Sequence, residues 1–178
     1  MATSLEIIKT TPVTSGVVTI NVDNVFTDKY EMYRVIFEGI YHDVDISNGI
    51  EGIRLIDSGG SVITQSEYSY MNHNVPMALS GSVEDNLYPT RDFIFLNLYA
   101  DQQSDGSANA IMNFYKPYES NTFTYLNSQA AGLNSSSGYA GKTIAVHRSA
   151  ETIRGFQLYE SNGARTFGGG KIIVYGVK

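Results

Sequence analysis

Residues 32–40 read MYRVIFEGI, and this stretch places Tyr33, Val35 and Phe37 at every second position. A spacing of two is the period of side chains along a β-strand, whereas an amphipathic helix repeats its apolar positions every three or four residues. Residues 16–22, GVVTINV, show the same spacing of valine and isoleucine. Both stretches therefore predict strands that turn one face to a core.

Alternating or β-branched runs of this kind recur along the whole chain. The strongest is Arg91–Tyr99, in which both parities are apolar. This pattern predicts a strand that is central in the domain or is also covered by a partner. No stretch sustains the apolar spacing of a helix over about ten residues. Further strands are predicted at Gly52–Asp57, Ser61–Ser66, Ala108–Tyr115, Thr122–Tyr125, Lys142–Arg148, Ile153–Tyr159 and Lys171–Val177.

Turn-forming sequences separate these runs, as in Ser47-Asn48-Gly49 and Asp57-Ser58-Gly59-Gly60. About nine strands joined by turns predict an all-β fold, an antiparallel β-sandwich of the jelly-roll kind. A closed barrel is the alternative. The triplet Gly168-Gly169-Gly170 leads into a strand-like run and not into a helix, so it predicts a tight turn or bulge and not a phosphate-binding loop.

The bulk composition limits the possible functions. The chain has 178 residues, a formal net charge of −6 and no cysteine. Its acidic balance argues against binding to nucleic acid or to an anionic membrane surface. The absence of cysteine excludes disulfides, thiolate metal ligands and a thiol nucleophile. No apolar run approaches the length of about 18 residues that a membrane span needs.

Two segments differ from the rest of the chain. Residues 1–14 are expected to form an N-terminal arm with a short strand-like part at Leu5–Lys9, and residues 15–178 a single β-sandwich domain. The arm contains the acidic Glu6 and no long apolar region, so we do not expect a signal peptide. Asn127–Gly141 reads NSQAAGLNSSSGYAG and is predicted to be a glycine-rich loop.

The candidate catalytic and metal-binding residues form no recognisable site. The acidic turn Asp43–Gly49 resembles a calcium loop, but the sixth position from Asp43 is Asn48 and the twelfth is Arg54, where an EF-hand needs glycine and glutamate. The three histidines are far apart in sequence, and no nucleophile elbow occurs. The sequence therefore predicts no catalytic residue, no metal site and no cofactor.

Tyrosine is abundant, with 13 copies in the chain. Tyr68 and Tyr70 share one face of a strand, Tyr115 and Tyr118 flank Pro117, and Tyr139 lies in the glycine-rich segment. Exposed tyrosines stack on sugars or anchor protein interfaces, whereas buried tyrosines fill the outer rows of β-sandwich cores. Both interpretations stay open at this point.

Three motifs follow one another along the chain. Residues 30–33 have the form Y-x-x-Y, residues 54–60 read RLIDSGG, and residues 169–176 read GGKIIVYG. This order resembles small bacteriophage virion structural proteins, namely capsid decoration, head-fibre and tail-fibre domains. The resemblance covers most of residues 14–177 and implies a β-sandwich that is repeated by the symmetry of a virus particle. It carries over no active site, because its motifs contain none.

The resemblance implies a non-enzymatic virion structural protein, made in the host cytoplasm. In the first hypothesis it is a capsid cement or decoration protein that bridges or stabilises major capsid protein subunits. Its partners would be the major capsid protein or other virion proteins, in a homo-oligomer or symmetric array. The alternative is a receptor-binding or glycan-binding domain of a fibre or tail. We predict interface contacts at Leu5, Ile7, Ile8, Leu133 and Tyr139.

Overall fold

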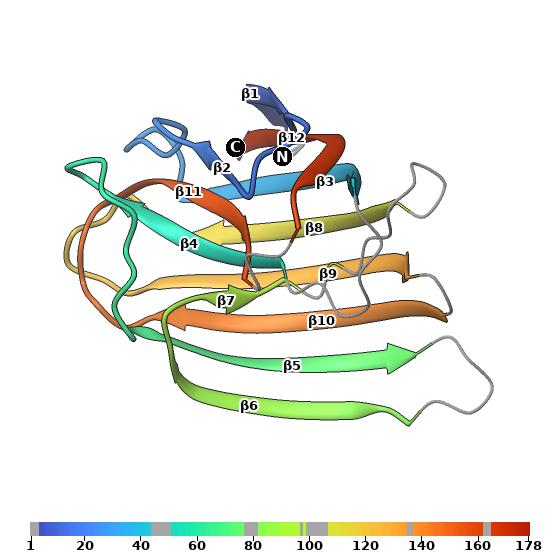
Figure 1. The fold of residues 1–178 in the computed structure, drawn as a ribbon. Helices are drawn as coiled ribbons and strands as arrows, with labels where there is room; N and C mark the ends of the chain where they lie inside the picture. The colour runs from blue at the N-terminus through green and yellow to red at the C-terminus, as the bar shows by residue number, and fades with distance from the viewer. Residues whose placement is uncertain are drawn as a thin grey trace.

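The computed structural model describes residues 4–43, 51–76, 82–96, 98, 107–134, 137–161 and 165–178. These residues form twelve strands and no helix, so none of them belongs to a helix that could cross a membrane (Figure 1). The strands are β1 Leu5–Pro12, β2 Thr19–Val22, β3 Met32–His42, β4 Glu51–Asp57, β5 Tyr68–Pro76, β6 Glu84–Arg91, β7 Ile94–Phe95, β8 Ala108–Tyr115, β9 Thr124–Asn134, β10 Ser137–His147, β11 Ile153–Glu160 and β12 Phe167–Val177.

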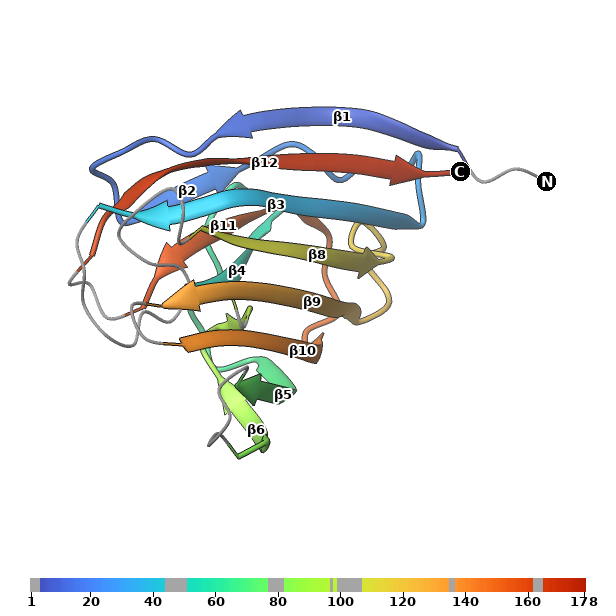
Figure 2. The same ribbon diagram turned by 90° about the vertical axis from the view of Figure 1, so that its right-hand side faces the viewer.

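The strands form two antiparallel sheets. The large sheet has eight strands in the order β1-β12-β3-β8-β9-β10-β5-β6, and the small sheet has four in the order β2-β11-β4-β7. Figure 2 shows the large sheet in front, with β2, β11 and β4 of the small sheet behind it. The prediction of an all-β, sandwich-like fold is thus confirmed.

The strand pairings are nested along the chain. β1 pairs with β12, β2 with β11, β3 with β8 and β4 with β7. The other four strands form two hairpins, β5–β6 and β9–β10, which extend the large sheet beyond β8. The strands β5 and β6 have no counterpart among the predicted strands, and together with β1 of the expected arm they account for the excess over the predicted nine.

Three phenylalanine rings join the two sheets at the centre of the core. Phe114 on β8 of the large sheet stacks on Phe156 on β11 of the small sheet, with 5.4 Å between ring centroids. Phe26, from the segment between β2 and β3, lies 4.9 Å from the Phe114 ring and 6.1 Å from the Phe156 ring. All three side chains are fully buried. The cluster therefore sets how closely the sheets approach each other.

Two strand predictions differ from the structure. Ser61–Ser66 is not a strand, because it meets β4 only through the isolated bridge between Ile56 and Val62. Of Arg91–Tyr99, Arg91 is the last residue of β6 and Ile94–Phe95 forms the short strand β7, among the described residues. Ile94, Phe95, Leu96 and Leu98 are buried inside the chain, so the apolarity of both parities reflects internal burial.

The prediction of a loop at Asn127–Gly141 is wrong. Its described residues belong to β9 and β10, which pair along their whole length as a hairpin. The inward positions are small because β7 comes close to β10: the Thr143 hydroxyl donates to the carbonyl oxygen of Phe95 at 2.9 Å. Serine, alanine and glycine there fit a narrow space, and their turn-forming composition hides the strand from a sequence pattern.

Residues 5–12, the described strand within the expected N-terminal arm, pair with β12 of the same chain as an edge of the large sheet. Glu6 fastens this strand through ion pairs with Lys29 and Lys178, at 2.7 and 2.8 Å. Hydrogen bonds from the Lys178 and Lys29 ammonium groups lower the pKa of Glu6 to about 2.

The start of β12 contains the predicted glycine bulge, with register shifts on both sides of Gly169 and a φ of 115° at Gly170.

The phenylalanine cluster leads to a stability prediction. Phe114→Ala should lower the free energy of unfolding by about 3–5 kcal/mol, because it removes a buried ring and leaves a cavity between the sheets. Phe123→Ala is the matched control, because that ring is 42 % exposed and its loss should cost less than about 1 kcal/mol. Urea unfolding of both variants measures the difference. Equal losses would contradict the role of the cluster.

Candidate interaction surface

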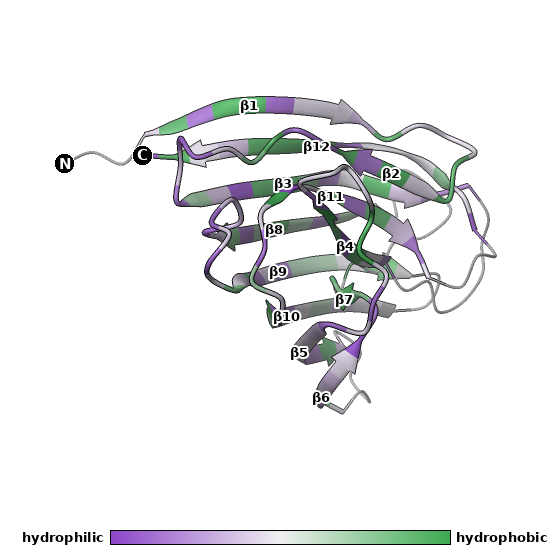
Figure 3. Cartoon of the chain, turned by 90° about the vertical axis from the view of Figure 1, so that its left-hand side faces the viewer, coloured by the Kyte–Doolittle hydropathy of each residue, from purple (hydrophilic) through white to green (hydrophobic). Residues whose placement is uncertain are grey.

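The face of the large sheet that points away from the small sheet, which we call the outer face, carries many exposed apolar side chains. Figure 3 shows apolar and polar segments alternating along β1 and β3, as expected for strands with two different faces. The alternation is incomplete on the outer face, because Ile173, Ile36 and Ile111 are adjacent partners across β12, β3 and β8. These side chains point away from the core.

Most exposed large apolar side chains of the described residues lie on this one face. At its far end Ile144, Met71 and Leu87 are partners across β10, β5 and β6. Ile144 is 61 % exposed and Leu87 75 %. Exposed apolar side chains that gather on one face of a protein often mark a contact with another molecule. The exposed members are Leu5, Ile7, Met71, Val75, Leu87, Ile111, Tyr125, Leu133 and Ile144.

A line of polar side chains crosses the middle of the outer face. Arg34 Nε donates to Asn113 Oδ1 at 3.0 Å, and Asn113 Nδ2 donates to Asn127 Oδ1 at 2.9 Å. Asn127 Nδ2 in turn donates to the Tyr115 hydroxyl at 2.9 Å. The chain of bonds runs over β3, β8 and β9 and fixes the orientation of both amides. An interface formed here would have fixed polar groups between two apolar areas.

A shallow groove of about 410 Å³ lies beside this polar line. Ile36 and Ile111 form its apolar side, and Gln129 and Ala131 from β9 complete it. The groove arises because the Ala131 side chain is short, whereas the side chains of the neighbouring isoleucines extend further from the sheet. A protruding side chain from a partner could enter at this point.

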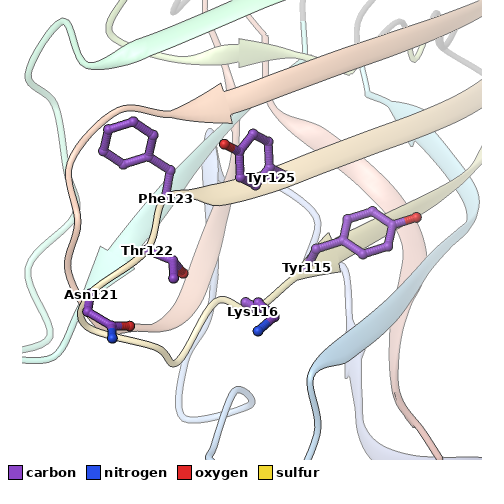
Figure 4. A pocket seen from close by; sticks show the side chains of 6 residues that line it. All are labelled: Tyr115, Lys116, Asn121, Thr122, Phe123 and Tyr125. Atoms are coloured by element: carbon purple, nitrogen blue, oxygen red, sulfur yellow. The ribbon is translucent and has the colours of Figure 1, made fainter.

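A second hollow, of about 390 Å³, lies where β8 ends and β9 begins. Figure 4 shows Tyr115 from β8 and Tyr125 from the start of β9. Lys116, Thr122 and Phe123 come from the connection between these strands. The Tyr125 ring is 54 % exposed. Tyr115 and Tyr125 are direct cross-strand partners. Aromatic rings beside amide and ammonium groups can bind either a protein side chain or a sugar ring.

The predicted interface residues lie on different parts of the molecule. Leu5, Ile7 and Leu133 are on the outer face, the first two at the β1 edge and Leu133 on the hairpin β9–β10. Ile8 packs against the core instead, because it follows Ile7 in the strand and therefore points to the opposite face. Tyr139 is half-buried and has the inward parity of Thr143. Sequence reasoning missed the central residues Arg34, Ile111 and Ile144, whose adjacency depends on strand register.

The acidic turn considered for calcium lies mostly outside the described residues. Its first residue, Asp43, accepts a hydrogen bond from the Thr166 hydroxyl. The neighbouring His42 Nε2 lies 2.5 Å from Glu51 Oε1, and His42 Nδ1 lies 3.3 Å from the Thr166 carbonyl oxygen. His42 and Glu51 are both fully buried and connect β3 of the large sheet with β4 of the small sheet. This pair therefore forms a buried polar contact between the sheets.

Comparison of the chain with protein-family models, with curated proteins and with solved structures found no significant match. The fold and its surface therefore define only a class, an all-β protein with two antiparallel sheets and an apolar outer face.

The outer face should control how the protein adheres to apolar surfaces. The double substitution Ile111→Thr and Ile144→Thr should shorten retention on a hydrophobic interaction column, because it replaces two exposed isoleucines with β-branched polar residues. Thermal unfolding should change little, since threonine suits a strand and the sites are exposed. Val18→Thr is the control, as Val18 is exposed outside the outer face. Retention that falls equally in the control would contradict a special role of this face.

Proposed function

We propose that this protein is a non-enzymatic structural protein of a virus particle, a cement or decoration protein that binds the major capsid protein or other particle proteins through its outer face. The observation that carries the proposal is the apolar area on the large sheet, crossed by the line from Arg34 to Tyr115. The resemblance of the sequence to bacteriophage virion proteins supplies the kind of partner.

The nested strand pairings support a jelly roll. When an antiparallel ribbon of eight strands is rolled up, its first strand pairs with its last, the second with the seventh, and so on inward. Eight strands of this protein pair in this manner, namely β1, β2, β3, β4, β7, β8, β11 and β12. The hairpins β5–β6 and β9–β10 are additions to this arrangement. Jelly rolls are common in viral capsid proteins, and also in lectins.

The outer face is large enough for a stable contact. Eight strands spaced by about 4.8 Å span roughly 34 Å, and strands such as β8 and β3 extend roughly 26–36 Å. The product is on the order of 900 Å², close to the roughly 800 Å² that each partner contributes to an ordinary specific interface. The groove and the polar line would set the register of the partner, since buried polar groups need matching partners.

Repetition on a particle makes a modest contact sufficient. Many copies of one protein on a symmetric shell face identical partner sites, so each contact contributes to the strength of the whole layer. Rigid sheets suit this role because little conformational entropy is lost on binding. The chain then occupies the virion, either as a homo-oligomer or as separate copies in a symmetric array.

Co-sedimentation with particles tests this function. The wild-type chain should sediment with particles purified from cells that produce it, and Ile111→Thr with Ile144→Thr should reduce the bound fraction about tenfold or more. Val18→Thr should sediment like the wild type. Failure of the wild type to sediment would reject the cement function. Equal binding of the double variant would reject the outer face as the contact.

A glycan-binding function on a fibre or tail is the second candidate, and the hollow of Figure 4 favours it. Exposed aromatic rings can stack on sugar rings, and the Tyr115 hydroxyl accepts a hydrogen bond from Asn127 while keeping its own proton to donate. On a glycan array Tyr125→Ala should abolish any binding. Tyr118→Ala should retain it, because Tyr118 is exposed but does not line this hollow. An array without any signal would exclude this candidate.

A further inference from the structure

Two connections between the sheets meet at a cluster of three side chains, Glu67, His147 and Glu151. Glu67 ends the connection from β4 to β5, His147 is the last residue of β10, and Glu151 lies in the connection from β10 to β11. The backbone N–H of Arg148 donates to the carbonyl oxygen of Glu67 at 2.8 Å and holds the two connections together. The cluster thus brings together residues that lie 80 positions apart.

The three side chains turn their ligand atoms toward one point. His147 Nε2 lies 3.3 Å from Glu67 Oε2 and 3.7 Å from Glu151 Oε1, and the three atoms all lie within 4.8 Å of one another. A tetrahedral ion with bonds of about 2.0–2.1 Å holds its ligand atoms roughly 3.3–3.4 Å apart. Small movements of the partly exposed glutamates would therefore complete the geometry.

The electrostatics of the cluster favour a cation. The His147 side chain is fully buried, whereas the side chains of Glu67 and Glu151 are 40 % and 33 % exposed. Burial lowers the pKa of His147, which disfavours a charged imidazolium between the two carboxylates. In the described part of the chain, no lysine or arginine forms an ion pair with either glutamate. The guanidinium of Arg148 instead donates to the carbonyl oxygen of Ser66 and to Thr90 Oγ1.

We propose that Glu67, His147 and Glu151 form a binding site for a divalent transition-metal ion of the zinc class. One neutral imidazole and two carboxylates are ligands that zinc accepts, whereas calcium and magnesium prefer oxygen ligands alone. The fourth position faces outward between the glutamates and is open to water or to a side chain of a neighbouring molecule. Bound metal would clamp the connections that join the hairpins to the sandwich.

The surroundings of His147 set the expected affinity. When Nε2 binds a metal, Nδ1 carries the proton, and in zinc sites this N–H usually donates to a neighbouring acceptor. His147 Nδ1 is buried, and no acceptor for it occurs among the described residues. Without a hydrogen bond from Nδ1–H to an acceptor, metal binding becomes about 10–100-fold weaker. The site should therefore bind zinc in the micromolar range, more weakly than a closed structural site.

Calorimetric titration of the full chain with zinc chloride tests the site. After treatment with EDTA and dialysis, the wild type should bind one zinc ion per chain at about pH 7. Glu67→Gln and Glu151→Gln should each weaken binding about tenfold or more, because each removes a ligand while keeping its size. Zinc should also raise the melting temperature of the wild type, and calcium should not.

His73→Gln is the matched control, because His73 Nδ1 lies 2.6 Å from Asp85 Oδ1 in an exposed pair to which the described residues add no third ligand. It should bind zinc like the wild type. The two glutamate variants decide the outcome even if substitution of the buried His147 prevents folding. No heat of binding at about 100 µM zinc, or unchanged affinity in Glu151→Gln, would overturn the proposal. This site rests on its own geometry, so its failure would leave the proposed function untouched.

Discussion

Packing of Phe114 against Phe156, with Phe26 beside both, holds the two sheets in register. Because successive side chains of a strand point to opposite faces, burying Phe114 also decides the direction of its neighbours. Asn113 and Tyr115, on either side of Phe114, must then lie on the outer face. Ile111, two positions before Asn113, must lie there too. A shift of one residue in β8 would bury the polar line and expose the core. The interaction surface is thus a consequence of how the core is packed.

The sequence could predict those parts of the fold in which large apolar residues alternate. Three such stretches each fall within an observed strand, namely Met32–Ile40, Ala108–Tyr115 and Ile153–Tyr159. A branched or aromatic side chain on every second residue is best buried when the chain forms a strand with one face on the core. The middle of the hairpin β9–β10, residues 127–134 and 137–141, could not be predicted from this pattern. Its buried positions, such as Ser128 and Ala130, must be small to fit against β7, and a small polar residue in a strand looks like one in a loop.

The candidate sites depend on information that a single sequence lacks. Apolarity on both parities at Arg91–Tyr99 left open a central strand or a surface covered by a partner, and the described residues show that this apolarity belongs to the core. The real outer face is assembled from single residues on separate strands, so Ile36 and Ile111 become neighbours only when the register is known. The same holds for His147 and Glu67, which no sequence spacing connects. The chain returns to Glu67 only at the end of β10, the sixth strand after it.

The edges of the large sheet indicate which kind of assembly its shape permits. An open edge strand can pair with another chain unless charge, proline or a bulge prevents it. At one edge β6 carries Glu84, Asp85 and Pro89, and at the other β1 has a bulge after Ile7 and ends at Pro12. Both edges therefore resist the addition of a strand, whereas the face between them is broad and apolar. Neighbouring molecules therefore contact the outer face and not the edges. Many copies can then bind partners through this face without their sheets joining edge to edge into one continuous sheet.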